Sequence, residues 1–239
     1  MLPAQSLHRS SAKSLPWVVF SLALLTAAAI LIPKGQEVYW LNGLHHPTLD
    51  ALMKTVTWWG EGFFLIPLLL AAPFVSGRAT VLVAASWVGH GLVCLLVKRL
   101  LFPGMARPLA VLDPMLLHFT EGVKVHAHYS FPSGHTATAF CIATVVILLS
   151  RKAWVGTVIT LLAVGVALSR IYLIQHFVVD VAAGAVIGAT VPIIVWLLLA
   201  RHPRAWMDRR LRAPKLFKNR FRPLPSGAFR TNRAFQKQL

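Results

Sequence analysis

The chain has 239 residues, of which 56% are hydrophobic and only 13% charged, and its mean hydropathy is +0.66. One water-soluble core of this size needs far less apolar mass, so a soluble globular domain is nearly excluded. Lys and Arg number 24 against 7 Asp and Glu. Half of these basic residues follow Ala200, so most of the excess positive charge belongs to a short C-terminal segment.

Long uncharged stretches in the rest of the chain predict membrane-spanning helices. Those without any Asp, Glu, Lys or Arg are 14–33, 62–77, 79–97, 125–150, 153–169 and 181–200. A spanning helix needs about 20 mostly apolar residues, or fewer where side chains at its ends reach the interface. The second stretch is short and holds Pro67 and Pro73, so we expect this span to begin earlier or to be kinked. The sequence therefore predicts an all-α integral membrane protein with six transmembrane helices.

Between the first two predicted spans, residues 38–59 mix polar and apolar side chains in a helical register that Pro47 opens. Trp40, Trp58 and Trp59 suit the depth of the lipid headgroups. We expect an amphipathic helix lying in the membrane interface here. An ordinary extramembrane loop is the alternative.

The distribution of basic residues predicts the orientation and the domains. Placing both termini inside puts most Lys and Arg on the cytoplasmic side, where such residues are retained. We expect residues 1–200 to form the membrane domain, in a bacterial inner (cytoplasmic) membrane, and residues 201–239 to form a basic cytoplasmic tail. The tail would contact anionic lipid or serve only as a solvated topology determinant. Nucleic acid is not an expected partner, because no binding fold precedes the tail and few aromatic residues accompany it.

Nearly all reactive side chains outside the tail gather in three patches at the predicted outer ends of helices. The first patch, 98–108, follows the third span, and the second, 130–135, has the sequence Ser-Phe-Pro-Ser-Gly-His. The third patch, 169–180, joins the fifth and sixth spans. All three face the same compartment, so the chain can bring them together at one membrane surface.

Several of these side chains suit a phosphate. Arg matches phosphate oxygens with a planar fork and Lys adds a point charge, so Lys98, Arg107 and Arg170 would together offset the charge of a phosphomonoester. Ser133 and Gly134 stand at a predicted helix start, whose free N–H groups suit an oxyanion.

Two histidines suit the chemistry of phosphoryl transfer. His176 and Asp180 are four residues apart, which on a helix places them on one face. The carboxylate could then hold one ring nitrogen of His176 and leave the other as a nucleophile. His135 could donate a proton to the leaving oxygen and later assist the attack of water.

Together the patches resemble the signature of the type 2 phosphatidic acid phosphatase superfamily. In that signature a Lys and a later Arg-Pro precede Pro-Ser-Gly-His, and Ser-Arg, five residues, His, three residues and Asp follow. The second and third parts match fully, at 132–135 and 169–180. The first part departs from the usual spacing of six residues, because eight residues separate Lys98 from Arg107 and seven separate Arg99 from it. Lys98 is the first choice for the lysine role, and Arg99 is the second.

The resemblance implies a lipid phosphatase that needs neither a metal nor a cofactor. In this scheme His176 forms a phosphohistidine, Asp180 is its partner and His135 is the general acid. The implied phosphate-binding residues are Lys98, Arg107, Ser133, Gly134 and Arg170. The active site would face the periplasm or exterior.

Several substrates are compatible with this resemblance. They are undecaprenyl diphosphate, phosphatidylglycerol phosphate and phosphatidic acid, with a lipid A phosphatase or a lipid phosphotransferase as the alternative. A phospholipid-binding membrane protein without turnover is an alternative of another class, as is an oxidative enzyme that holds vanadate in the same pocket.

Overall fold

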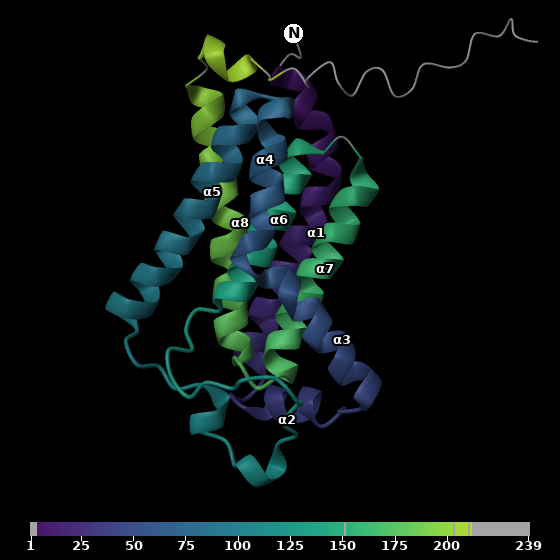
Figure 1. Ribbon diagram of the computed structural model, residues 1–239, viewed down its shortest axis with the longest axis vertical. Coiled ribbons are helices and arrows are strands. Elements are labelled where there is room, and N and C mark those ends of the chain that lie inside the picture. The colour runs from purple at the N-terminus through teal and green to yellow at the C-terminus, as the bar shows by residue number, and fades with distance from the viewer. Residues whose placement is uncertain (1–3, 151, 203, 210, 212–239) are drawn as a thin grey trace, which may run out of the picture.

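The computed structural model describes residues 4–150, 152–202, 204–209 and 211, and in this part of the chain every regular element is helical (Figure 1). The helices are α1 (Ala4–Leu31), α2 (Gln36–Asn42), α3 (Pro47–Thr57), α4 (Leu65–Val75), α5 (Gly77–Leu96), α6 (Gly134–Leu149), α7 (Ala153–Tyr172) and α8 (Val178–Arg201). Shorter 3-10 turns lie at 58–60, 62–64, 108–110, 114–116 and 205–208, and a π-helical stretch follows α5 at 97–101. The prediction of an all-α protein is confirmed.

The helices run up and down in one long bundle. Both ends of the described chain lie at one end of the bundle, whereas α2 and the loops between α5 and α6 lie at the other (Figure 1). Four helical segments are long and apolar enough to cross a membrane, namely Ser14–Leu31, Gly77–Leu101, Ala153–Tyr172 and Val178–Arg201. The protein is thus a multi-pass membrane protein.

The predicted count of six spans is not confirmed. Segments Pro47–Gly60 and Gly62–Val75 would form a fifth span only as a pair bent by 60°, which agrees with the kink expected there. α6 is apolar but has only 16 residues. α6 is shorter than the uncharged stretch 125–150 because residues 125–133 form a loop. The loop includes Pro132 near its end, and the helix begins at Gly134.

The single interfacial helix expected over residues 38–59 is not confirmed either. The segment holds two helices, α2 and α3, separated by a turn at 43–46. His46 caps α3 by accepting a hydrogen bond from the Thr48 amide, and Pro47 takes the first helical position. α3 then continues through the bend toward α4 instead of lying apart from the bundle.

α6 is the central helix of the bundle and packs against α5, α7 and α8. It is apolar on all sides, which suits a helix surrounded by other helices. Gly184 and Gly188 of α8 allow the closest approach. A Cβ atom at Gly184 would lie 2.4 Å from the Ser133 backbone oxygen, and one at Gly188 would lie 2.2 Å from the Ala137 oxygen. Small residues therefore set the distance between α8 and the start of α6.

The outside of the bundle is apolar. Phe20, Leu70, Val88 and Leu161 are each more than half exposed, and they belong to α1, α4, α5 and α7. Exposed apolar side chains on several helices of one bundle match a surface that faces lipid.

The beginning of the predicted basic tail packs onto the membrane domain. Asp208 forms an ion pair with Arg78 at 2.9 Å, and the Leu211 amide donates a hydrogen bond to the Pro73 oxygen at 2.9 Å. These contacts fasten Asp208 and Leu211 to the region where α4 ends and α5 begins. The rest of the expected tail, 212–239, lies outside the described residues, as do residues 1–3.

Candidate active site

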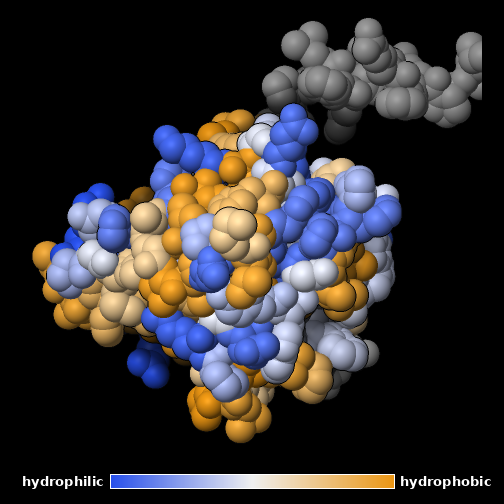
Figure 2. Space-filling model, turned by 90° about the horizontal axis from the view of Figure 1, so that it is seen from below, coloured by the Kyte–Doolittle hydropathy of each residue, from blue (hydrophilic) through white to orange (hydrophobic). Residues whose placement is uncertain are grey.

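The three polar patches meet around one cavity of about 430 Å³ near the end of the bundle that is opposite the described termini. Seen from this end, hydrophilic residues gather across the middle of the molecule, between apolar patches (Figure 2). Six of the predicted site residues line the cavity: Lys98, Arg107, Gly134, His135, Arg170 and His176. Asp180 and Ser133 lie behind this wall and are almost completely buried.

The third patch forms a tight turn between α7 and α8. Ile174 has a left-handed backbone conformation with a φ of 59°, which is rare for a β-branched residue. The Arg170 oxygen accepts hydrogen bonds from the amides of Gln175, at 2.9 Å, and His176, at 3.1 Å. This turn brings the side chains of Arg170 and His176 to the same cavity.

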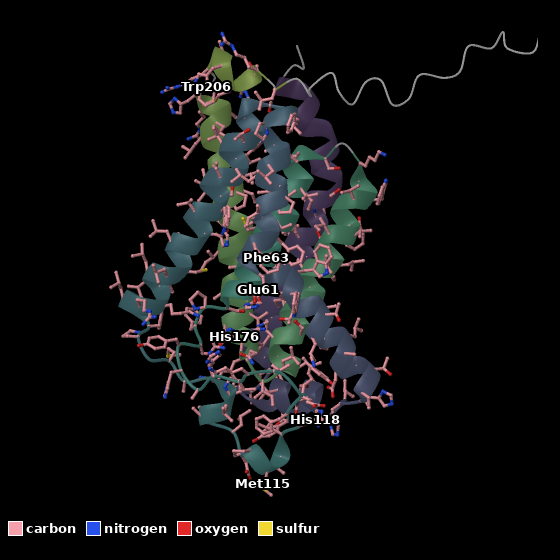
Figure 3. The ribbon with its side chains drawn as sticks, in the orientation of Figure 1. Glu61, Phe63, Met115, His118, His176 and Trp206 are labelled. Atoms are coloured by element: carbon pink, nitrogen blue, oxygen red, sulfur yellow. The ribbon has the colours of Figure 1, made fainter. Side chains whose placement is uncertain are left out.

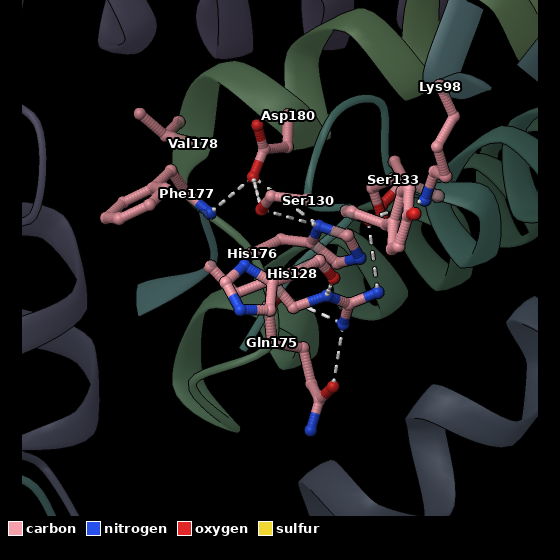
Figure 4. Close-up of polar contacts among 12 residues, drawn as sticks. Lys98, His128, Ser130, Ser133, Gln175, His176, Phe177, Val178 and Asp180 are labelled. Atoms are coloured by element: carbon pink, nitrogen blue, oxygen red, sulfur yellow. Dashed lines mark hydrogen bonds and ion pairs between the residues drawn. The ribbon is translucent and has the colours of Figure 1, made fainter. Parts of the chain in front are cut away.

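His176 and Asp180 form a pair, although not on one helical face as their spacing predicts. His176 precedes the first helical residue of α8, and its Nδ1 lies 3.4 Å from Asp180 Oδ2 (Figure 4). The same carboxylate oxygen accepts a hydrogen bond from the Phe177 amide at 3.0 Å and a short one from the Ser130 hydroxyl. Asp180 thus caps α8 and orients His176 at once, which leaves His176 Nε2 for the cavity.

Burial sets the protonation state of His176. The ring is 2% exposed, and desolvation, aided by Arg170 and Arg107, lowers its pKa to about 3, against the hydrogen bond to Asp180 that raises it. A neutral imidazole has the free electron pair that a nucleophile requires.

Basic residues that form no ion pair with a carboxylate within the described part of the chain line the cavity: Lys54, Lys98, Arg107, Lys124 and Arg170. Arg107 donates from Nε to the His128 oxygen at 2.9 Å and from Nη1 to Gln175 Oε1 at 3.0 Å. Arg170 donates from Nη1 to the Thr57 hydroxyl at 2.8 Å, and its buried Nε has no hydrogen-bond partner among the described residues. The acceptors of both guanidinium groups are neutral, and the basic residues that line the cavity outnumber the one acidic lining residue, Glu61, so the cavity suits an anion.

The structure distinguishes Lys98 from Arg99. Lys98 lines the cavity and donates from Nζ to the Tyr129 oxygen at 3.0 Å. The Arg99 guanidinium lies over the Tyr129 ring, 4.3 Å from its centre, and is not among the residues that line the cavity. Lys98 is therefore the better placed of the two to bind phosphate.

Ser133 and Gly134 are not equivalent, although both were predicted as amide donors. The Ser133 amide donates to the Asp180 backbone oxygen at 3.0 Å, and its hydroxyl lies 3.0 Å from that of Thr136. Ser133 is thus already engaged within the protein. Gly134 begins α6 and lines the cavity, and a helix start leaves its first amides without an intrahelical acceptor.

Two acidic residues that the motifs do not include form contacts in this region. Glu61, in the bend between α3 and α4, has Oε1 3.0 Å from His135 Nε2. Glu37 of α2 is 3% exposed and accepts a hydrogen bond from the Val178 amide, at the start of α8, at 3.0 Å. Both residues lie outside the three patches. Only Glu61 has a sequence feature that could have marked it as functional, since it is an acidic residue between two glycines in an apolar region.

Two curated proteins are similar to this chain in sequence. Phosphatidylglycerophosphatase B of Bacillus subtilis is 31% identical over 161 residues, which are 61% of this chain and 72% of the relative. Lipid A 4'-phosphatase of Bacteroides thetaiotaomicron is 29% identical over 164 residues, which are 64% of this chain and 71% of the relative.

Two solved membrane proteins resemble the structure. The crystal structure of Aquifex aeolicus LpxE has a TM-score of 0.59 and 28% identity, covering 68% of this chain and 93% of that chain. The PAP2-type phosphatidylglycerolphosphate phosphatase of Bacillus subtilis has a TM-score of 0.57 and 24% identity, covering 81% of this chain and 98% of that one, and it supports the fold alone.

A family model described as the PAP2 superfamily matches residues 78–204. This match includes all three polar patches and more than half of the chain. The resemblance that the motifs indicate is thereby confirmed: the chain belongs to the PAP2 superfamily.

Proposed function

We propose that this protein is a lipid phosphatase that hydrolyses a phosphomonoester or diphosphate of a membrane lipid through a phosphohistidine. One observation carries the proposal. His176, buried beside Asp180, faces the same cavity as His135 and the three cations of the motifs, which have no ion-pair partner within the described residues: Lys98, Arg107 and Arg170.

The geometry supports a reaction in two steps. In the first, His176 Nε2 forms a bond to phosphorus while the bond from phosphorus to the lipid oxygen breaks, and that oxygen takes a proton from His135. In the second, water forms a bond to phosphorus, the bond to His176 breaks, and His135 takes the proton of the water. Lys98, Arg107 and Arg170 would stabilise the charge on the transferring group in both steps, without a metal ion.

A second cavity supports a lipid substrate. It measures about 300 Å³ and shares Glu61, Lys98, Gly134 and His135 with the first. α5 diverges from the bundle at this end (Figure 1) and contributes Gly91, Cys94 and Leu95 to the second cavity. A lipid chain between α5 and the neighbouring helices would keep its phosphate beside His176.

Phosphatidylglycerol phosphate, phosphatidic acid and undecaprenyl diphosphate are the substrates that we propose first. The similarity to a phosphatidylglycerophosphatase supports this choice. A phosphate of lipid A is the second candidate, because a lipid A 4'-phosphatase is nearly as similar. Transfer of the phosphate to another lipid would use the same intermediate, with a lipid hydroxyl in place of water.

We place the protein in a bacterial inner membrane with both termini in the cytoplasm and the cavity on the periplasmic side. The excess of basic residues near the termini supports this orientation. The cavity lies toward the opposite end of the bundle from the described termini (Figure 3), as this orientation requires.

Phosphate release from each lipid by the purified full-length protein tests the proposal. The wild type should release phosphate from at least one lipid and should carry an acid-labile phosphoryl group after rapid quenching. His176→Asn should do neither, whereas His202→Asn, at an exposed position away from the cavity, should do both. Activity that persists in His176→Asn would reject the mechanism, and tight lipid binding by the wild type without release would favour a binding protein.

A further inference from the structure

Glu61 is an acidic residue at the break between two helical segments. It lies between the turns Trp58–Gly60 and Gly62–Phe64, where the helix pair bends by 60°. Residue 61 precedes the segment that the family model matches, 78–204. The three motifs therefore assign no role to it, although it lines both cavities.

The bend is packed directly against the start of α6. A Cβ atom at Gly60 would lie 2.8 Å from both the Cβ and the backbone oxygen of His135. Only glycine permits this approach without displacing the chain. The approach sets Glu61 Oε1 at 3.0 Å from His135 Nε2, and the side chain of Glu61 remains 47% exposed.

The surroundings of His135 explain why a carboxylate matters there. Burial, and after it the charges of Arg170, His176, Arg107 and Lys98, disfavour a proton on the ring. The three cations oppose a positive charge on His135, yet a general acid must carry a proton before it can donate one. Asp180 already accepts hydrogen bonds from Ser130 and Phe177 and faces His176. Within the described residues, Glu61 is the acidic side chain that contacts His135.

We propose that Glu61 is the positioning residue of the general acid: it orients the His135 ring and stabilises its protonated form. The proposal rests on the proposed function. When the bond from phosphorus to the leaving oxygen breaks, the proton passes from the His135 imidazolium to that oxygen, and His135 becomes neutral. Glu61 keeps its contact with the ring and supports the return of a proton from water in the second step. The site then contains two pairs of histidine and carboxylate, His176 with Asp180 for the nucleophile and His135 with Glu61 for the acid.

The dependence on the leaving group tests this role in turnover. Glu61→Gln keeps a hydrogen-bond acceptor but removes the charge, and Glu61→Asp keeps the charge. With a lipid or alkyl phosphate, whose leaving oxygen needs a proton, Glu61→Gln should lower the rate by about 10- to 100-fold. With nitrophenyl phosphate, whose leaving group needs little protonation, the loss should be only about 2- to 3-fold, since the acid contributes less.

The controls separate positioning from a structural role. Glu61→Asp should recover most of the alkyl phosphate activity, and Asp113→Asn, at an exposed residue that lines neither cavity, should match the wild type on both substrates. Equal losses on both substrates in Glu61→Gln, or no loss on either, would overturn the proposal. A failure of the proposed function looks different, because the wild type itself would then release no phosphate from any lipid.

A measurement without turnover makes the test independent of activity. Ring-nitrogen NMR of histidine-labelled protein, with His135→Asn to assign the signal, follows the protonation of His135. Removing the carboxylate disfavours the imidazolium, so in Glu61→Gln the midpoint should move to lower pH. An unchanged midpoint would contradict the role of Glu61, whatever the substrate proves to be.

Discussion

The Ser133 amide donates a hydrogen bond to the backbone oxygen of Asp180, at 3.0 Å, and so joins the second polar patch to the third through the main chain. Asp180 holds His176 with its side chain and the Pro-Ser-Gly-His turn with its backbone. The distance between the two histidines therefore depends on how closely α8 approaches the start of α6.

Gly184→Ala should disturb this approach, because the new Cβ atom would lie 2.4 Å from the Ser133 oxygen. We expect a loss of about 1 to 3 kcal/mol in stability from overpacking and a clear fall in kcat. Thermal unfolding in detergent and phosphate release measure the two effects. Gly91→Ala is the matched control, since nothing lies within 4 Å of its Cβ position. If both variants behaved alike, the close contact at Gly184 would not be setting the geometry.

Ser130 and Ser133 provide a second comparison within one loop. The Ser130 hydroxyl donates to the carboxylate that orients His176, whereas the Ser133 hydroxyl contacts only Thr136 among the described residues. Ser130→Ala should lower kcat by about tenfold, the effect of one lost hydrogen bond to a charged group, with little change in KM. Ser133→Ala should have a smaller effect. Steady-state kinetics on one lipid substrate checks both, and a larger loss in Ser133→Ala than in Ser130→Ala would contradict this ranking of the two hydroxyl groups.

Glu37→Gln tests the buried carboxylate at the start of α8. Glu37 accepts hydrogen bonds from the Val178 amide at 3.0 Å and the Gly35 amide at 2.7 Å. Loss of its charge should lower stability by about 1.5 to 3 kcal/mol, because hydrogen bonds to charged groups are among the stronger ones. Asp113→Asn is the control, as Asp113 caps an exposed turn. Unfolding temperatures of the two variants should differ by several degrees, and equal values would contradict this role of Glu37.

The sequence predicted those parts of the site that depend on local pattern. The uncharged stretches predicted helices close to α5, α7 and α8, because apolar content decides which segments enter a membrane. The order of the three patches predicted six residues that line one cavity. The lack of charge alone does not locate the start of α6, because the uncharged stretch 125–150 includes the loop 125–133; the Pro-Ser-Gly-His motif predicted that start, and α6 begins at Gly134.

Contacts between distant segments could not be predicted in the same way. The pairing of Glu61 with His135 spans 74 positions, and that of Glu37 with Val178 spans 141. No motif spacing encodes either pair, since each depends on how α2 and the bend at Gly60 pack against other helices. The engagement of the Ser133 amide by Asp180 is also a tertiary contact, which is why Ser133 was predicted as a free donor.

The low pKa of His176, about 3, predicts its behaviour with pH. Between pH 3 and the ordinary histidine value of 6.5, the folded protein keeps the ring neutral whereas the unfolded chain binds a proton. Stability should therefore decrease as the pH falls through 6.5. Ring-nitrogen NMR, assigned with His176→Asn, should show a neutral imidazole at pH 5. A signal that titrates near 6.5 would contradict the effect of burial on which the proposed role of this ring as a nucleophile depends.

Gly91→Phe tests the second cavity as the place of the lipid chain. Gly91 lines that cavity from α5, and no atom lies within 4 Å of its Cβ position, so a side chain can begin there and would narrow the cavity. We expect kcat/KM for lipid phosphates to fall by about tenfold. A loss of this order is expected when one apolar contact worth about 1 to 3 kcal/mol of binding free energy is displaced. Nitrophenyl phosphate has no lipid chain to place in this cavity. Its kcat/KM should therefore change by less than about twofold, because the substitution removes no contact with this substrate. Gly91→Ala, which leaves most of the cavity open, should retain both activities. Equal losses on lipid and soluble substrates in Gly91→Phe would mean that the substitution damages the catalytic cavity, and unchanged lipid turnover would place the lipid chain elsewhere.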